Sequence, residues 1–392
     1  MALISASFAD AGERGRAIGT WSGFTAITSA FGPVLGGWLV ENASWRWVFL
    51  VNLPLAITVL VLTFWRVPES RDPDAPGGLG GIDGWGAVLA TLGLAGFVYG
   101  FTEAPNRGWT SPTVLGPLIL GATSLAAFIA VESRGRAPMM PLSLFSSPTF
   151  RGANLLTFFL YAALSGALFF VPFNLIQVQG YGSTAAGAAL LPMILLMFVL
   201  SRWAGGLIGL FGPKPPLIVG PTIAAAGFAL FARPGVGGGY WTTFFPPTVV
   251  LGLGLAITVA PLTTAVMSAV DQRHAGLASG INNAVSRAAG VLAIALFGIV
   301  VAATFGNSLT HQVRSLPIPA DAQTAIIAQR DRLAEVEPPP TLDPAARAAT
   351  LAAVDRAFVS GFRWVMLLAA AMALMSALMA ALLIENPKRQ SR

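Results

Sequence analysis

Side chains that carry most enzymatic chemistry are scarce in this chain. It contains no cysteine, and its only two histidines, His274 and His311, are far apart in the sequence. Thiol nucleophiles, disulfides and thiolate metal sites are therefore excluded, and a histidine-built metal centre is not expected. Five acidic residues lie at the ends of long apolar stretches rather than inside them: Glu41, Glu103, Glu132, Asp271 and Glu385. We therefore predict no metal, no cofactor, no catalytic residue and no enzymatic activity.

Polar side chains inside two of the apolar stretches are the better candidates for a site. Asn283 and Arg287 share one face of a helix at i, i+4 spacing, and a charge in lipid costs at least about 2.5 kcal/mol. Asn154, Phe158 and Tyr161, followed by Ser165, form a polar and aromatic stripe at helical spacing. Both groups are candidate walls of a cavity for lipophilic compounds. An interhelical polar clamp and ordinary core packing are the alternatives that remain open.

Ten apolar stretches of bilayer length position these residues. Charged residues make up 10% of the chain, hydrophobic residues 55%, and the mean hydropathy is +0.71. A bilayer core of about 30 Å takes about 20 apolar residues as helix. The sequence therefore predicts an all-α integral membrane protein, a polytopic helical bundle in a lipid bilayer. The expected spans are 16–40, 45–65, 84–103, 113–132, 152–173, 184–209, 215–232, 241–265, 277–304 and 358–384.

The basic residues between spans predict the orientation, because cytoplasmic loops are enriched in lysine and arginine. One set of loops and span ends contains Arg14, Arg16, Arg66, Arg71, Arg134, Arg136, Arg151, Arg202, Lys214, Arg273, Lys388, Arg389 and Arg392. The opposite short loops contain only Arg46, Arg107 and Arg233. Both termini are therefore expected in the cytoplasm of a multi-pass cell-membrane protein, with 306–357 outside. Because the net charge of +6 serves topology, no nucleic-acid partner is expected.

Near the start of the chain, a basic loop precedes a glycine-rich span. The loop is Glu13-Arg-Gly-Arg-Ala-Ile-Gly19, and Gly32, Pro33, Gly36 and Gly37 follow in the span. The next span begins at Ser44-Trp-Arg-Trp-Val-Phe-Leu-Val-Asn-Leu-Pro54, and Gly276-Leu-Ala-Ser-Gly-Ile-Asn-Asn-Ala-Val-Ser-Arg287 opens the ninth. Glycines at this spacing let helix backbones approach closely, and Pro33 lacks the N–H of a regular helix. Generic packing by small residues is the alternative.

These residues resemble the major facilitator superfamily, and within it the fourteen-span drug:proton antiporters. Gly32, Pro33, Gly36 and Gly37 are similar to the end of the antiporter motif, although Thr28 stands where that motif usually begins with glycine. The resemblance implies that this motif packs against the other half of the transporter. It also implies that the ten spans are family spans five to fourteen, so that the first three to four spans are lacking.

The resemblance divides the chain into three parts. Residues 1–66 would be the remnant of the N-terminal six-helix half, 67–151 a linker and an inserted helix pair, and 152–392 the C-terminal six-helix half with the outer loop 306–357. Asp343-Pro344 predicts an N-cap and first turn of a short surface helix ending near 356.

The implied function is multidrug efflux by proton antiport. The implied partners are a lipophilic or amphipathic small molecule and protons, and a periplasmic adaptor stays open. Because no acid is expected at mid-membrane, the proton-coupling residues are expected in the lacking helices. A non-transporting membrane remnant and an exporter of one specific metabolite are the alternatives.

Overall fold

The computed structural model describes residues 28, 31–66, 83–134, 140–271 and 274–386. Within these ranges the chain is all-helical and contains no strand. Nine helical segments there are long and apolar enough to cross a membrane, and they correspond to the last nine predicted spans. Of the first predicted span, 16–40, only Thr28 and residues from 31 onward are described, and a helix covers 31–42. The predicted polytopic membrane bundle is therefore confirmed.

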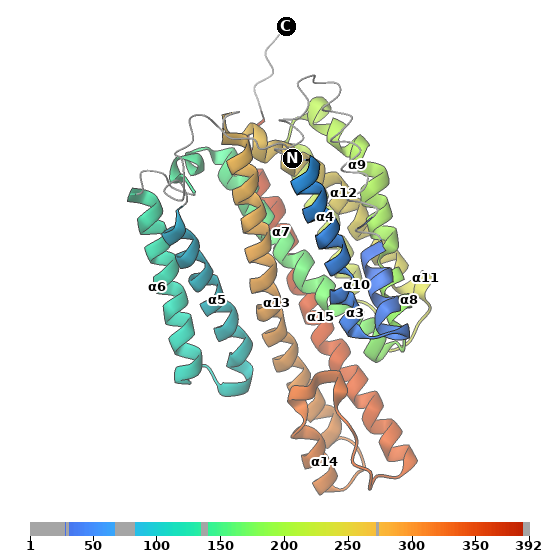
Figure 1. Cartoon of the computed structure of the whole chain (residues 1–392). Coiled ribbons are helices and arrows are strands. Elements are labelled where there is room, and N and C mark those ends of the chain that lie inside the picture. Colours follow the sequence, from blue (N-terminus) through green and yellow to red (C-terminus); the bar gives the residue numbers. More distant parts are fainter. Residues whose placement is uncertain (1–27, 29–30, 67–82, 135–139, 272–273, 387–392) are drawn as a thin grey trace.

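The remaining elements follow in chain order (Figure 1). They are α3 (Trp45–Leu50), α4 (Asn52–Arg66), α5 (Gly84–Arg107), α6 (Pro112–Arg134), the 3₁₀ helix η2 (Leu142–Ser146), α7 (Pro148–Phe173), the π-helical turn η3 (Asn174–Val178), α8 (Ser183–Ala188), α9 (Leu191–Phe211), α10 (Lys214–Phe231), α11 (Tyr240–Thr243), α12 (Phe245–Ser268), α13 (Ala275–Arg314), α14 (Ala320–Ile327), the 3₁₀ helix η5 (Arg330–Glu335) and α15 (Pro344–Leu383).

Side-chain caps that the local sequence explains begin α5, α7 and α15, as Ser44 does for α3. The Ser147 hydroxyl accepts from the Phe150 N–H at the start of α7, and the Asp83 carboxylate accepts from the Gly86 N–H at the start of α5. The predicted cap Asp343 accepts from the Ala346 N–H, 2.8 Å away. Each cap satisfies an N–H that the first helical turn leaves without a partner.

The core lies among α7, α10, α12, α13 and α15, with α9 packed on α12. Phe150, Phe228, Phe297 and Phe362 are fully buried there. Small residues allow these helices to approach: a Cβ on Gly254 would meet the backbone of Gly220 and Ala224. Such close backbone approach replaces the hydrophobic driving force that helices lack in lipid.

The pair α5 and α6 forms a hairpin at the side of this core (Figure 1). Its two helices are in close contact, since a Cβ on Gly96 would collide with the backbone of Pro117 and Gly121. Only α5 of the pair packs extensively on the rest of the bundle, against α13. By contrast, no residue of α3 or α4 is buried, so these two helices present apolar side chains outward.

Two helices are much longer than predicted. Both α13 and α15 contain 40 residues, or about 60 Å of helix at 1.5 Å per residue, about twice the bilayer core. Their paired ends project beyond the other helices and carry α14 between them (Figure 1). The predicted surface helix therefore does not end near 356, because it continues into the last span as α15.

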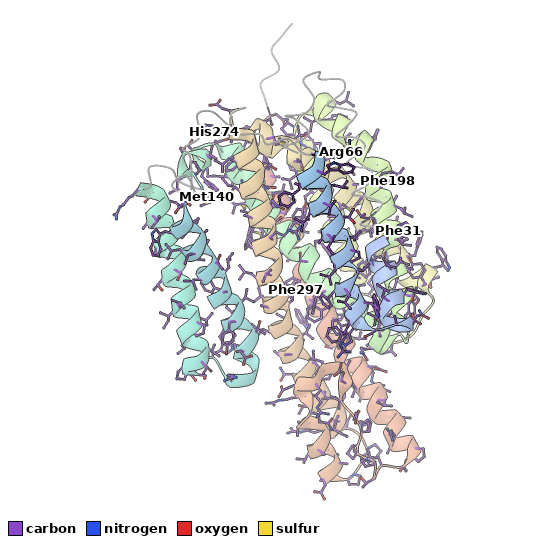
Figure 2. The ribbon with its side chains drawn as sticks, in the orientation of Figure 1. Phe31, Arg66, Met140, Phe198, His274 and Phe297 are labelled. Carbon is purple, nitrogen blue, oxygen red and sulfur yellow. The ribbon has the colours of Figure 1, made fainter. Side chains whose placement is uncertain are left out.

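The projecting segment has a small core of its own. Leu309, Val313, Ile326 and Val336 are buried in it, and the Arg356 Nε donates to Gln312 Oε1 at 2.8 Å. The expected outer loop 306–357 is therefore a helical projection. Arg66, Met140 and His274, which flank three of the predicted cytoplasmic loops, all lie toward the opposite end of the bundle (Figure 2).

This arrangement predicts which positions an impermeant thiol reagent can reach in intact cells. The chain has no cysteine, so Ala325→Cys in the projection and Ser133→Cys at the end of α6 each introduce one exposed thiol. Because the basic loops are expected in the cytoplasm, we expect labelling at 325 and none at 133 until the cells are permeabilised. Labelling at 133 but not at 325 in intact cells would reverse the orientation.

Candidate functional site

A cavity of about 980 Å³ opens between α7, α12 and α13. One wall comes from α7, a second from α12, and most of the surface comes from the first five turns of α13. The lining residues are Tyr161, Ser165, Thr263, Val266, Met267, Gly276, Ser279, Gly280, Asn282, Asn283, Ser286, Arg287, Gly290, Val291 and Ile294. Hydroxyl and amide groups and an apolar surface thus face the same space, as in sites for small amphipathic molecules.

Arg287 is the only charged side chain among these lining residues. It lies 12 residues after the start of α13, about 18 Å along the helix, which corresponds to the middle of a bilayer core of about 30 Å. The exposed Arg287 side chain lines the cavity together with Tyr161 of α7. A cation at this depth is therefore held by a polar, open space rather than by lipid.

Asn282, one position before Asn283, forms the contact that holds α13 against α7. Its Nδ2 donates to Asn154 Oδ1 at 3.2 Å and to Thr157 Oγ1 at 2.7 Å. Asn154 and Thr157 are buried, and each also donates to a carbonyl one turn earlier on α7. These three side chains form a polar clamp between two apolar helices.

The structure separates the predicted cavity residues into two groups. Tyr161, Asn283 and Arg287 line the cavity, together with Ser165 of the predicted stripe. Asn154 does not line it, because it belongs to the clamp, and Phe158 packs against the Ala162, Ala289 and Ala293 cluster. Periodicity placed all four stripe residues on one side of α7, whereas the position of α13 decides which of them reach the open space.

The sequence reasoning missed the contribution of α12. Thr263, Val266 and Met267 form that wall, within a run of apolar residues that carries no polar periodicity. The sequence did contain a signal for the α13 wall of the cavity. Its small and polar residues recur at short intervals and all line the cavity: Gly276, Ser279, Gly280, Asn283 and Ser286.

The predicted antiporter-motif residues lie on the helix over 31–42, against α8. A Cβ on Gly37 would overlap the Ser183 carbonyl group and meet the Thr184 Cα, and one on Gly187 would overlap the Pro33 carbonyl group. Among the described residues, no neighbouring atom lies within 4 Å of a Cβ at Gly32 or Gly36. The close approach expected of the motif thus falls on Gly37 and Pro33.

Glu41 adds a polar contact at the end of the same helix. The Thr184 N–H and hydroxyl both donate to Glu41 Oε2, at 3.0 and 2.6 Å. These two hydrogen bonds lower the pKa of the exposed Glu41 carboxyl, so it stays ionised at neutral pH. Arg14 and Arg16, which precede this helix, lie outside the described residues.

The acidic residues agree with their predicted positions at helix ends, with one difference in burial. Glu132 is buried at the end of α6, where its Oε2 accepts from the Met140 N–H at 3.0 Å. Asp355 lies on α15 next to Arg356, in the projection. No described carboxylate lies in the middle of the bilayer-length core, and no described group of three or more His, Asp or Glu side chains could hold a metal ion.

A second, apolar groove of about 340 Å³ lies between α5 and α13. Val98, Phe101 and Thr102 of α5 line it opposite Ala295 and Gly298 of α13. Val291 and Ile294 line both this groove and the larger cavity, so the two spaces meet at one face of α13.

A sequence profile described as Major Facilitator Superfamily matches residues 1–294. The chain belongs to the major facilitator superfamily. Two similar relatives are the tetracenomycin C resistance and export protein of Streptomyces glaucescens and the multidrug resistance protein Stp of Mycobacterium tuberculosis. Both are 32% identical, over 94% and 86% of this chain and 68% and 60% of their own lengths, respectively.

More distant relatives have similar names. The multidrug transporter protein MdtP of Bacillus subtilis is 28% identical over 80% of this chain and 58% of its own length. The chain therefore spans about three fifths of the curated relatives it matches. A solved bacterial homologue of the human lysosomal transporter Spinster, in an inward-facing and unoccupied conformation, is 16% identical over 98% of this chain and 89% of that one, with a TM-score of 0.46.

Asn282→Ala should destabilise the bundle because it leaves the buried Asn154 carbonyl oxygen without its Asn282 donor. Interhelical polar contacts in membranes contribute about 0.6–2 kcal/mol. We expect thermal unfolding in detergent a few degrees below wild type, with little change for the matched control Asn283→Ala, whose side chain faces the cavity. Equal unfolding temperatures for the two variants would exclude the clamp.

Gly37→Leu should separate the helix over 31–42 from α8, because its side chain would occupy space filled by the Ser183 and Thr184 backbone. Overpacking of this kind costs about 1–3 kcal/mol. The measurement is monodispersity and unfolding temperature in detergent. Gly36→Leu is the control, since its Cβ meets no atom within 4 Å, and a larger loss for Gly36→Leu would contradict the assigned contact.

Proposed function

We propose that this chain forms part of an exporter of lipophilic or amphipathic small molecules in the cell membrane, with both termini in the cytoplasm. The observation that carries the proposal is the cavity between α7, α12 and α13. It combines hydroxyl and amide groups with an apolar wall, and it lies between three membrane-length helices in a member of a transporter superfamily. Relatives named for drug resistance and export support the same direction of transport.

The motif residues and the clamp would have structural roles in this function. Gly37 and Pro33 would hold the helix over 31–42 against α8, as the family resemblance implies for contact between the two halves. The clamp at Asn282 would fix α13 at one height on α7, so that Asn283 and Arg287 keep facing the cavity. Tyr161 and Ser165 would supply hydrogen bonds to the compound from the opposite wall.

Proton antiport is the energy source we propose for export. An antiporter needs a titratable group that can exchange protons with both sides, and arginine remains protonated at physiological pH. Since the described residues provide no mid-membrane carboxylate, we place the coupling acid outside them. An uncoupler should therefore abolish efflux only in a protein that supplies this acid.

The proposal predicts that filling the cavity blocks export. Gly280 lines the cavity and its Cβ would meet no atom within 4 Å, so Gly280→Phe should place its ring in the binding space without displacing a helix. The measurement is efflux of a fluorescent lipophilic dye from drug-sensitive cells that express the chain. We expect Gly280→Phe to reduce efflux to the level of cells without the protein.

Gly298→Phe is the matched control for this experiment. It lies on the same helix, has the same free space around its Cβ and faces the smaller groove instead. It should export the dye like wild type at equal expression. Export by Gly280→Phe at the wild-type rate would show that the dye does not pass through the cavity. An absence of export by wild type would instead favour a non-transporting membrane protein.

A further inference from the structure

The charge of the cavity distinguishes it from a general hydrophobic drug site. Its lining contains one cation, Arg287, and no carboxylate among the described residues. The other polar groups that face the cavity are neutral: the hydroxyls of Tyr161, Ser165, Thr263, Ser279 and Ser286 and the amides of Asn282 and Asn283. A cationic compound entering this space would meet a like charge and no described counter-ion.

Arg287 has unused hydrogen-bonding capacity. Its guanidinium carries five N–H donors and forms no ion pair or side-chain hydrogen bond with any described residue. Asn282, by contrast, is occupied by Asn154 and Thr157. The guanidinium is permanently charged, lies at mid-membrane depth and is open to a cavity. An anionic group of a ligand can therefore accept its paired N–H donors.

The apolar wall lies close to this charge along the same helix. Val291 is one turn after Arg287 and Ile294 is two turns after it, and both line the cavity. A ligand that fits both features carries a negative group at one end and an apolar ring system at the other.

Resting on the proposed export function, we propose that the cavity selects amphipathic organic anions. The anionic group, a carboxylate or an acidic phenol, accepts hydrogen bonds from the Arg287 guanidinium, and the ring system packs against Val291 and Ile294. Asn283 and Ser286 donate to the remaining oxygen atoms of the ligand. Lipophilic cations are disfavoured by the like charge.

The test uses two xanthene dyes of similar size and opposite charge: fluorescein, an anion at alkaline pH, and rhodamine 123, a cation. Binding to the purified full chain in detergent is followed by fluorescence anisotropy. We expect fluorescein to bind at least about tenfold more tightly than rhodamine 123, because a hydrogen bond to a charged group accounts for about one decade of affinity or more.

Arg287→Gln should weaken fluorescein binding by about tenfold or more and leave rhodamine 123 binding unchanged or stronger. Rhodamine binding to this variant also shows that it is folded. Arg287→Lys keeps the positive charge but lacks the planar, paired N–H donors, so it should retain part of the preference for fluorescein over rhodamine 123. Arg314→Gln is the control: the same change on the same helix, exposed, and about 40 Å away by helical rise.

Three outcomes would overturn the inference. Tighter binding of rhodamine 123 to wild type, or an unchanged fluorescein preference in Arg287→Gln, would show that Arg287 does not select the ligand while leaving the export function intact. Equal affinities for the two dyes in wild type would show that the cavity does not discriminate between ligands by charge. Failure of wild type to bind or export either dye would instead reject the proposed function itself.

Discussion

A polar side chain on a helix in lipid needs a partner or water, and the arrangement around α13 depends on this requirement. Asn282 and Arg287 are less than two turns apart on the same helix, and they meet the requirement differently. Asn282 finds two buried acceptors on α7, whereas Arg287 faces an open cavity with neutral polar walls. Because the clamp fixes α13 against α7, it also determines which side chains can face the cavity.

Close backbone approach makes the rest of the bundle possible. Helices in lipid gain little from burying apolar side chains, so their contacts depend on packing and hydrogen bonds. Gly37 against Ser183, Gly187 against Pro33, Gly96 against Pro117 and Gly254 against Gly220 each place two backbones where a Cβ would not fit. These contacts connect the helix over 31–42 to α8, α5 to α6, and α10 to α12. The glycine-rich composition thus serves helix packing at identifiable positions.

Two spaces of different polarity lie on adjoining faces of α13. The face of α13 that carries Asn283 and Arg287 is polar and opens toward α7 and α12, while the adjoining face meets α5 through an apolar groove. Val291 and Ile294 belong to both surfaces. Within two turns, α13 therefore presents one charged group and two apolar side chains to the same space.

The sequence by itself determined the membrane class, seven of the nine described spans to within about five residues, the Asp343 cap and the family, because each depends on local hydropathy, a short motif or a single capping side chain. It also identified Tyr161, Asn283 and Arg287, since helical periodicity places residues on a face. Only the tertiary structure decided that Asn154 belongs to a clamp, that α12 supplies a cavity wall, and that Gly37 rather than Gly36 is in close contact. Periodicity along one helix does not specify the height and rotation at which a second helix packs against it. For the same reason the length of α15 could not be read from the sequence: the polar projecting turns look like a loop until they pair with the end of α13.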